Sequence, residues 1–290
     1  MTNKFQDVIN QATVLTDQTK TTLDTQFTLA PAGMSLGRLV DYIEVGKQPR
    51  KAFKGETKDP ALCVYLTFEL LSPKNIREID VAGVKKKVAD RITVSTTLSL
   101  HEKAKFKKLF NKMRYGRDSI THMSQMLGDE FKITVVHNEV GEGDKKKVYA
   151  NITDSDGSFL IEAPYLRNEE AGTSVKANVA PALSDLRLFI WGVPTKATWD
   201  SIFIDGERTV KDDKGQEVKV SKNFYQNLIM SAVNFPGSPV ESFLHGPDAL
   251  PTDPEKLNTV ETVTETTTPV SDKVAPATMS SDDIMAQLGL

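Results

Sequence analysis

Residues 61–72, ALCVYLTFELLS, alternate large apolar side chains with smaller or more polar ones over most of their length. A period of two predicts a β-strand, because successive side chains of a strand point to opposite faces of a sheet. The segment therefore predicts a sheet with one apolar face and one mixed face, and it favours a mainly β protein. The apolar face holds Leu62, Val64, Leu66, Phe68 and Leu70, and the other face holds Cys63, Tyr65, Thr67 and Glu69.

The remaining periodicities extend this sheet and add a few helices. Glycines at 37 and 46 inside the first strand predict bulges or bends. The class expected is therefore mainly β with a few helices (α+β). We expect further strands at 36–47, 91–98, 131–137, 146–153 and 186–193, a hairpin of 202–210 with 217–220, and helices at 102–113, 119–127 and 222–233.

The chain divides into three regions by composition. Residues 1–28 predict a weakly amphipathic helix or a loose arm, and residues 29–246 a globular domain. Residues 247–290 are rich in Pro, Thr, Glu and Val and have no aromatic residue, so they bury too little apolar surface to offset the entropy of ordering. We expect a disordered tail there. Its end is predicted to be a docking peptide for partner proteins, through Asp282, Asp283, Ile284, Met285, Leu288 and Leu290.

Charge is distributed unevenly between these regions. The whole chain has a formal net charge of -3. Residues 247–290 contain eight acidic and two basic residues, a net charge of -6, which leaves +3 for residues 1–246. A mildly basic body with an acidic tail is typical of proteins that bind partners through charge.

Several classes of protein are disfavoured by the same composition. No segment approaches the ~20 consecutive apolar residues that span a bilayer, and the N-terminus does not have the pattern of a secretory signal. The single Cys63 has no partner for an internal disulfide and is expected to be a small core residue in a reducing cytoplasm. We therefore expect neither membrane insertion nor secretion.

A basic loop is predicted at 48–60, between the first two strands. Five cations and one aromatic residue occur in and beside it, a composition that suits phosphate contacts and stacking on a base. The alternative is an ordinary solvated loop. The residues concerned are Lys47, Arg50, Lys51, Phe53, Lys54 and Lys58.

Tyrosines and basic residues on the strand faces extend this hypothesis. Tyr65 lies opposite the apolar face of its strand, and Lys147 and Tyr149 share one face of theirs. Arg38 and Tyr42 are expected to share a face of the first strand. Exposed aromatics beside lysines would form a stacking platform for bases, whereas ordinary cross-strand packing is the alternative.

Two short lysine runs, 85–87 and 145–147, also fall in turn-like settings. They are expected to be surface turns, with contact to a DNA backbone as the alternative. Lys145 of the second run is included among the predicted binding residues.

Motifs for catalysis are missing from the sequence. The four histidines are widely spaced without partners at metal-ligand spacing, and no phosphate-binding loop of the G-x-x-x-x-G-K-[ST] type occurs. The segment 154–157, Asp-Ser-Asp-Gly, lacks the downstream glutamate of a calcium loop and predicts a hairpin turn. We therefore expect no enzyme, no metal and no cofactor.

Three segments resemble the single-stranded DNA-binding proteins of tailed bacteriophages of enterobacteria and their relatives. They are 32–47 (AGMSLGRLVDYIEVGK), 58–70 (KDPALCVYLTFEL) and 199–206 (WDSIFIDG), and the likeness extends over most of 32–233 plus the C-terminus. The resemblance implies a five-stranded OB-fold barrel with insertions, sequence-tolerant binding of single strands, and a tail that contacts other replication or recombination proteins. In that class the last residue is often aromatic, whereas this chain ends in Leu290.

The sequence thus predicts a protein that coats single-stranded DNA in the cytoplasm of an infected bacterium. Its partners would be single-stranded DNA and, through the tail, phage or host replication proteins. Two alternatives stay open: a phage structural or assembly protein, and a DNA-processing enzyme whose site is assembled by folding.

Overall fold

The computed structural model describes residues 29–53, 56–81, 83–141, 146–168, 172–211 and 216–246. The predicted arm at 1–28 and the predicted tail at 247–290 lie outside these ranges. At positions 51–53, 56, 57, 81, 167, 168 and 211 only the backbone is described.

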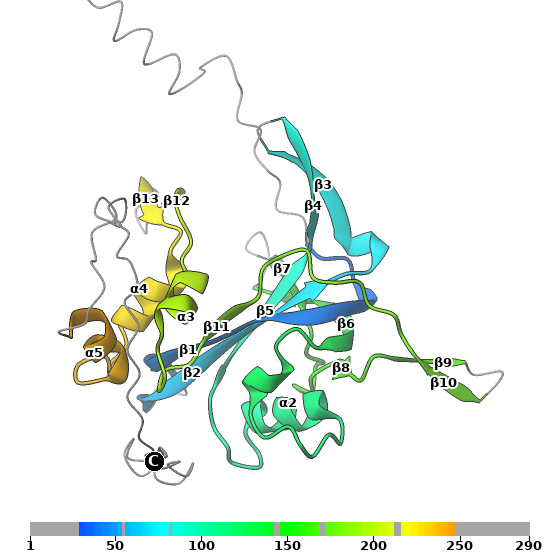
Figure 1. Ribbon diagram of the computed structural model, residues 1–290, viewed down its shortest axis with the longest axis horizontal. Coiled ribbons are helices and arrows are strands. Elements are labelled where there is room, and N and C mark those ends of the chain that lie inside the picture. The colour runs from blue at the N-terminus through cyan, green and yellow to red at the C-terminus, as the bar shows by residue number, and fades with distance from the viewer. Residues whose placement is uncertain are drawn as a thin grey trace, which may run out of the picture. The chain divides into compact units, whose positions relative to one another are not determined.

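A seven-stranded sheet forms the centre of the protein (Figure 1). Its main path runs β5-β2-β1-β6-β7 through antiparallel pairs; β11 joins β1 in parallel, and β8 joins β6. The strands are β1 (Gly33–Phe53), β2 (Glu56–Leu70), β5 (Arg91–Thr97), β6 (Glu130–Val140), β7 (Lys147–Asn151), β8 (Ile161–Glu162) and β11 (Arg187–Phe189). The mainly β class is confirmed, but no pairing between described residues joins β7 to β5, so this sheet is not a closed barrel.

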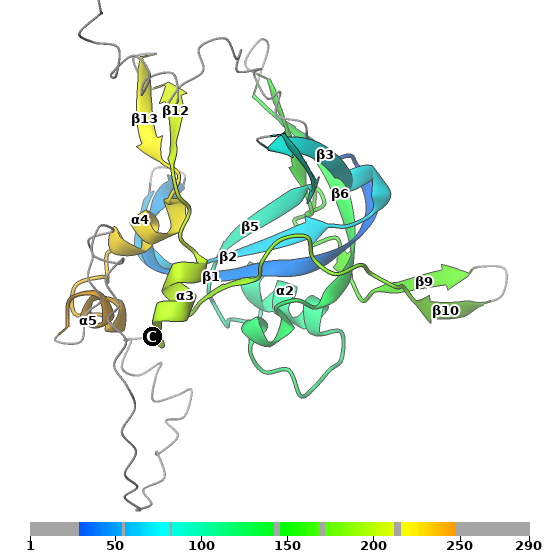
Figure 2. The same cartoon turned by 45° about the horizontal axis from the view of Figure 1, so that its top comes forward.

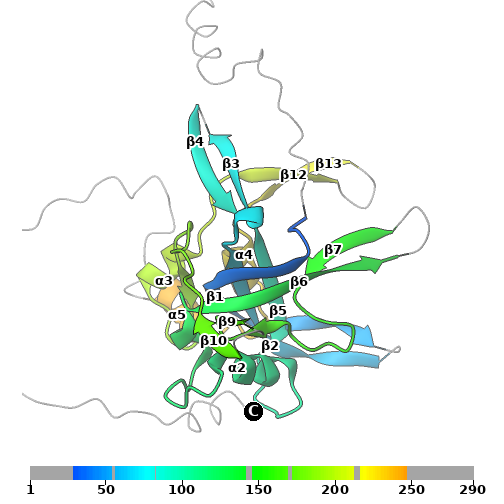
Figure 3. The same ribbon diagram turned by 90° about the vertical axis from the view of Figure 1, so that its right-hand side faces the viewer.

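Three two-stranded hairpins accompany the central sheet, and Figure 3 shows β3–β4 as a separate ribbon. The sequence predicted only the last of the three. It began that hairpin too early, because residues 202–204 follow directly on a helix. The hairpins are β3 (Ile76–Val81) with β4 (Val84–Ala89), β9 (Tyr165–Asn168) with β10 (Thr173–Lys176), and β12 (Glu207–Lys211) with β13 (Glu217–Ser221).

The helices are short, and none in the described part of the chain has the length and apolar character needed to cross a membrane. The buried stripe of α2 packs against the sheet, as predicted for 102–113. Figures 1 and 2 show α3, α4 and α5 grouped beside the ends of β1 and β2. The helices are α2 (Lys105–Arg114), α3 (Lys196–Ser201), α4 (Phe224–Met230) and α5 (Pro239–His245), with 3-10 turns at Pro73–Asn75 and Met123–Met126.

The helix predicted at 119–127 is wrong, since only the 3-10 turn Met123–Met126 forms there. The Gln125 side chain accepts hydrogen bonds from the backbone N–H groups of Thr121 and His122, and the His122 ring accepts one from the N–H of Ser124. Side chains that bond to nearby backbone compete with the helical pattern. Gly128 then leaves the turn with a φ of 84°.

Apolar side chains are buried on both faces of the sheet. On β2, Val64, Leu66, Phe68 and Leu70 are fully buried in a core that includes α2, as the alternation predicts. The opposite face of β2 packs Cys63 and Tyr65 against a second core, formed with α4, α5 and β11. The face predicted to be open is therefore largely covered.

The predicted loop at 48–60 is instead most of a β-hairpin. β1 continues to Phe53 and β2 begins at Glu56, with Arg50 paired to Lys58 and Phe53 to Glu56. The predicted bulge at Gly46 is confirmed, because the register shifts between Glu44 and Lys47 and Gly46 has a φ of 73°. A side chain at Gly46 would also meet the Trp191 ring.

Candidate nucleic-acid interface

A groove of about 760 Å³ lies on the outer face of β2 and β5. Its lining includes residues 91–93 of β5 and 149–150 of β7, the two ends of the sheet path. The groove therefore occupies the place where the sheet stays open. The β3–β4 hairpin, the segment 183–187, Ser201, Phe203, Glu69 and residues 29–30 also line it.

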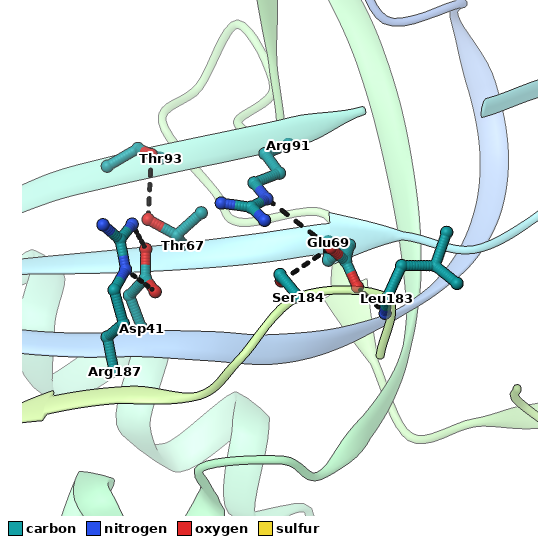
Figure 4. A network of polar contacts seen from close by, with 8 residues as sticks. All are labelled: Asp41, Thr67, Glu69, Arg91, Thr93, Leu183, Ser184 and Arg187. Carbon is teal, nitrogen blue, oxygen red and sulfur yellow. Dashed lines mark hydrogen bonds and ion pairs between the residues drawn. The ribbon is translucent and has the colours of Figure 1, made fainter. Parts of the chain in front are cut away.

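Arg187, which lines the groove, forms an ion pair with a buried carboxylate. Arg187 Nε and one terminal nitrogen donate to the two Asp41 oxygens at 2.8 and 2.6 Å (Figure 4). The Asp41 side chain is 1% exposed and that of Arg187 18%. The Arg187 guanidinium also lies over the Tyr225 ring, 5.4 Å from its centroid. The Asp41 carboxylate and the Tyr225 ring therefore hold the Arg187 guanidinium in place from two sides.

A second buried carboxylate, Glu69 on β2, holds the segment 183–187 across the sheet. Its oxygens accept hydrogen bonds from the Leu183 backbone N–H and the Ser184 hydroxyl, both at 2.7 Å, and Arg91 Nε lies 3.5 Å away. Figure 4 shows these groups meeting over β2 and β5, next to the hydrogen bond between Thr67 and Thr93. Glu69 needs these partners, because burying a carboxylate without hydrogen bonds or an opposite charge carries a large free-energy penalty.

Two aromatic rings in the groove lining are half exposed. Tyr149 on β7 is 50% exposed and Phe203, just after α3, is 54% exposed. They come from separate elements of the lining. Exposed rings offer π-faces on which unpaired bases of any sequence stack.

The groove lining carries more positive than negative side chains. Five cations stand against three acids in the lining, and Asp41, which pairs with Arg187 from outside the lining, reduces the surplus to one positive charge. Lys86 and Lys87 make no ion pair within the described residues, whereas the three arginines are each paired with a carboxylate. The cations are Arg77, Lys86, Lys87, Arg91 and Arg187, and the acids are Glu69, Asp90 and Asp185.

Tyr42 does not lie on any surface, which corrects the sequence prediction for it, and Arg38 lies outside the groove lining. Tyr42 is fully buried, its hydroxyl donates to Glu44, and burial raises the pKa of its phenol. Arg38 donates to the carbonyls of residues 128, 179 and 180 and to the Glu130 carboxylate. The two residues are not on one face either: Arg38 lies opposite Glu69 and Tyr42 opposite Leu66, because the register shifts between Leu39 and Asp41.

Tyr65 lies outside the groove lining. It is half buried, with edge contacts to Phe224 at 5.8 Å and Tyr225 at 5.6 Å between ring centroids. Burial raises the pKa of its phenol. Packing against α4 is therefore the main role that the structure gives this ring.

The other predicted residues fall on two hairpins. Arg50 and Lys58 are exposed and Lys47 partly so in the β1–β2 hairpin, and none of the three lines the groove. Lys147 is exposed two residues from Tyr149. Lys51 and Phe53 lie in β1, but their side chains are outside the description. Also outside the described residues are Lys54, Lys145 and the tail residues Asp282, Asp283, Ile284, Met285, Leu288 and Leu290.

Sequence reasoning missed Phe203 and the groove arginines. Ile202 is buried and Phe203 exposed, but the sequence Ile-Phe-Ile at 202–204 gives no signal for this difference. Arg91 and Arg187 gave no signal either, because each lies at the start of a predicted strand, like many surface arginines.

In comparisons with known proteins, no family model, no curated protein and no solved structure matches this chain.

Proposed function

We propose that this protein binds single-stranded DNA without sequence preference and is related to the single-stranded DNA-binding proteins of tailed phages. It would protect and organise exposed strands during phage DNA replication, recombination and repair in the host cytoplasm. The acidic tail would recruit replication proteins. The observation that carries the proposal is the groove, which combines two half-exposed rings with a surplus of cations.

The strand order supports an OB-type sheet. β1, β2 and β5 form an antiparallel meander, α2 follows, and β6 returns to the free edge of β1 before pairing with β7. An OB-fold is a five-stranded, partly open barrel that binds oligonucleotides on its second and third strands and on two of its loops. By this assignment those strands are β2 and β5, which supply Glu69, Arg91 and Thr93 to the groove.

The two hairpins with predicted binding residues also fit this assignment. The β1–β2 and β6–β7 connections correspond to the two loops with which OB-folds bind strands. Arg50 and Lys58 are exposed on the first hairpin, and Lys147 on the second. Cations there would follow phosphates that leave the groove.

Stacking on Tyr149 and Phe203 explains why the ligand should be single-stranded. In a duplex both faces of each base are covered by neighbouring pairs, so a ring has no access to them without unstacking. In an unpaired strand each base offers a free face, and stacking contributes about 1–3 kcal/mol per base.

The test is a titration of short fluorescent single- and double-stranded oligonucleotides at several salt concentrations, with gels of the products. We expect a preference for single strands, an affinity that falls with salt, and no cleavage. No binding to single strands at low salt would refute the proposal. Metal-dependent cleavage would instead indicate a nuclease, and co-purification with virions without a strand preference would indicate an assembly protein.

Deleting residues 247–290 is expected to raise the affinity for single strands, most strongly at low salt. The deletion removes a net charge of -6 from a chain whose remaining part carries +3. Unscreened tail charges compete with DNA over ~30 Å at 0.01 M salt but only ~10 Å at 0.1 M. The measurement compares binding curves of both proteins at these two salt concentrations. Equal affinities at 0.01 M would exclude competition by the tail.

A further inference from the structure

The β3–β4 hairpin is a lysine-bearing insertion between β2 and β5. It pairs with no strand other than its own partner among the described residues, and it stands off the central sheet as a ribbon (Figures 1 and 3). β4 contains three consecutive exposed lysines, Lys85, Lys86 and Lys87. A separate hairpin with this run of exposed lysines is a candidate for contact with a negatively charged ligand.

Polar contacts at its base fix the direction of the hairpin. Asn75 and Asp90, just outside its two strands, are 1% and 9% exposed. The Asp90 backbone N–H donates to the Asn75 carbonyl at 2.9 Å, and the Asn75 side chain bonds to Ser35 on β1 at 2.9 Å. Asp90 also forms an ion pair with Arg77. The ribbon is therefore anchored to the sheet at its root.

The two faces of the hairpin differ in charge. Because side chains alternate, the pairs Glu78–Lys87 and Asp80–Lys85 occupy one face, where each lysine lies opposite an acid. The other face contains the pairs Arg77–Val88 and Ile79–Lys86, in which both charged residues are cations. Charge is thus balanced on one face and positive on the other.

Both faces contribute to the groove lining, but they contribute different residues. The positive face supplies Arg77, Lys86 and Val88, and the balanced face supplies Lys87 and Ala89. Lys85 is not part of the lining. Lys86 lies opposite an uncharged residue and makes no ion pair within the described ranges, so its ammonium is available to a ligand.

We infer that the β3–β4 hairpin is a phosphate-binding arm, which guides the backbone of a single strand along its Lys86 face as the strand leaves the groove. The inference rests on the proposed function and adds a contact that the sheet and the two OB loops do not supply. Lys86 neutralises one phosphate, with Lys87 at the rim as a second donor. Lys85, the other lysine of the balanced face, lies outside the groove lining and takes no part.

The experiment compares Lys86→Gln with Lys85→Gln in the full-length protein. Both changes remove one exposed lysine charge from the same strand, but from opposite faces. One phosphate contact contributes ~0.7 to the slope of log affinity against log salt. For Lys86→Gln we expect the slope to be shallower by ~0.7 than that of the wild type. The ratio of wild-type to variant affinity for a dT oligonucleotide should therefore be about fivefold larger at 0.1 M salt than at 1 M. Lys85→Gln should change neither.

Each outcome decides the inference. A loss confined to Lys86→Gln supports the arm. Equal losses of affinity in both variants would reveal only a general effect of charge, and no loss in either would show that the hairpin is not part of the interface. Both results refute the arm. The proposed function would still stand in both cases, provided that the wild-type protein binds dT. A wild-type protein that does not bind dT would refute both. Thermal melts of the variants, expected to match the wild type, verify folding.

Discussion

Arg187→Ala is expected to lower the free energy of unfolding by about 3–5 kcal/mol, because it leaves the buried Asp41 carboxylate without its partner. Asp41 is 1% exposed, and both of its oxygens accept hydrogen bonds from Arg187. The variant also loses the contact between the guanidinium and the Tyr225 ring. Denaturant unfolding monitored by circular dichroism measures the difference.

The exposed pair Lys196–Asp200 provides the matched control. Its two side chains are 51% and 54% exposed, so Lys196→Ala should change the unfolding free energy by only about 0–1 kcal/mol. Similar small effects of both substitutions would mean that the Asp41 carboxylate does not depend on Arg187 in the folded protein. The hydrogen bonds between Arg187 and Asp41 would then contribute less to the free energy of unfolding than their geometry implies.

The double substitution Tyr149→Ala with Phe203→Ala is expected to weaken single-strand binding by about 2 kcal/mol or more, that is by at least ~30-fold, because two stacking surfaces are lost. The half exposure of both rings means that little packing is lost with them. Thermal stability should therefore stay close to that of the wild type. Fluorescence anisotropy with a labelled oligonucleotide measures the affinity.

Tyr165→Ala serves as the control for this pair. Tyr165 on β9 is 44% exposed, a similar fraction, but does not line the groove. Its loss should leave affinity unchanged. An equal decrease from Tyr165→Ala, or no decrease from the double variant, would show that the groove is not where bases stack.

Tyr65→Ala is expected instead to lower stability, because its ring packs against Phe224 and Tyr225.

Local sequence patterns predicted the strand and helix faces that are set by residues close together in the chain. The alternation in 61–70 identified four of the five side chains of the apolar face of β2 that are fully buried; Leu62 is only partly buried, and Thr67 and Glu69 of the other face are buried too. The apolar stripe of α2 identified its buried face. Both follow from the geometry of a single strand or helix. The prediction for Arg38 and Tyr42 failed at a bulge, where one extra residue reverses the alternation.

Of the residues that line the groove, the sequence prediction of binding residues named only Tyr149. The contacts that build the groove join residues far apart in the chain: Leu183 lies 114 residues from Glu69, and Arg187 lies 146 residues from Asp41. No local periodicity reports such pairs. The charge difference between the faces of the β3–β4 hairpin likewise depends on a register that appears only when the strands pair.

The amino-acid sequence by itself determined the mainly β class, the apolar face of β2 and the contrast between a basic body and an acidic tail, because composition and alternation along one strand are local properties. Only the tertiary structure decided which polar faces are covered and which cations line a groove. That choice depends on how segment 183–187, α4 and the β3–β4 hairpin pack on the sheet, and packing between distant segments is set by the free energy of the whole fold.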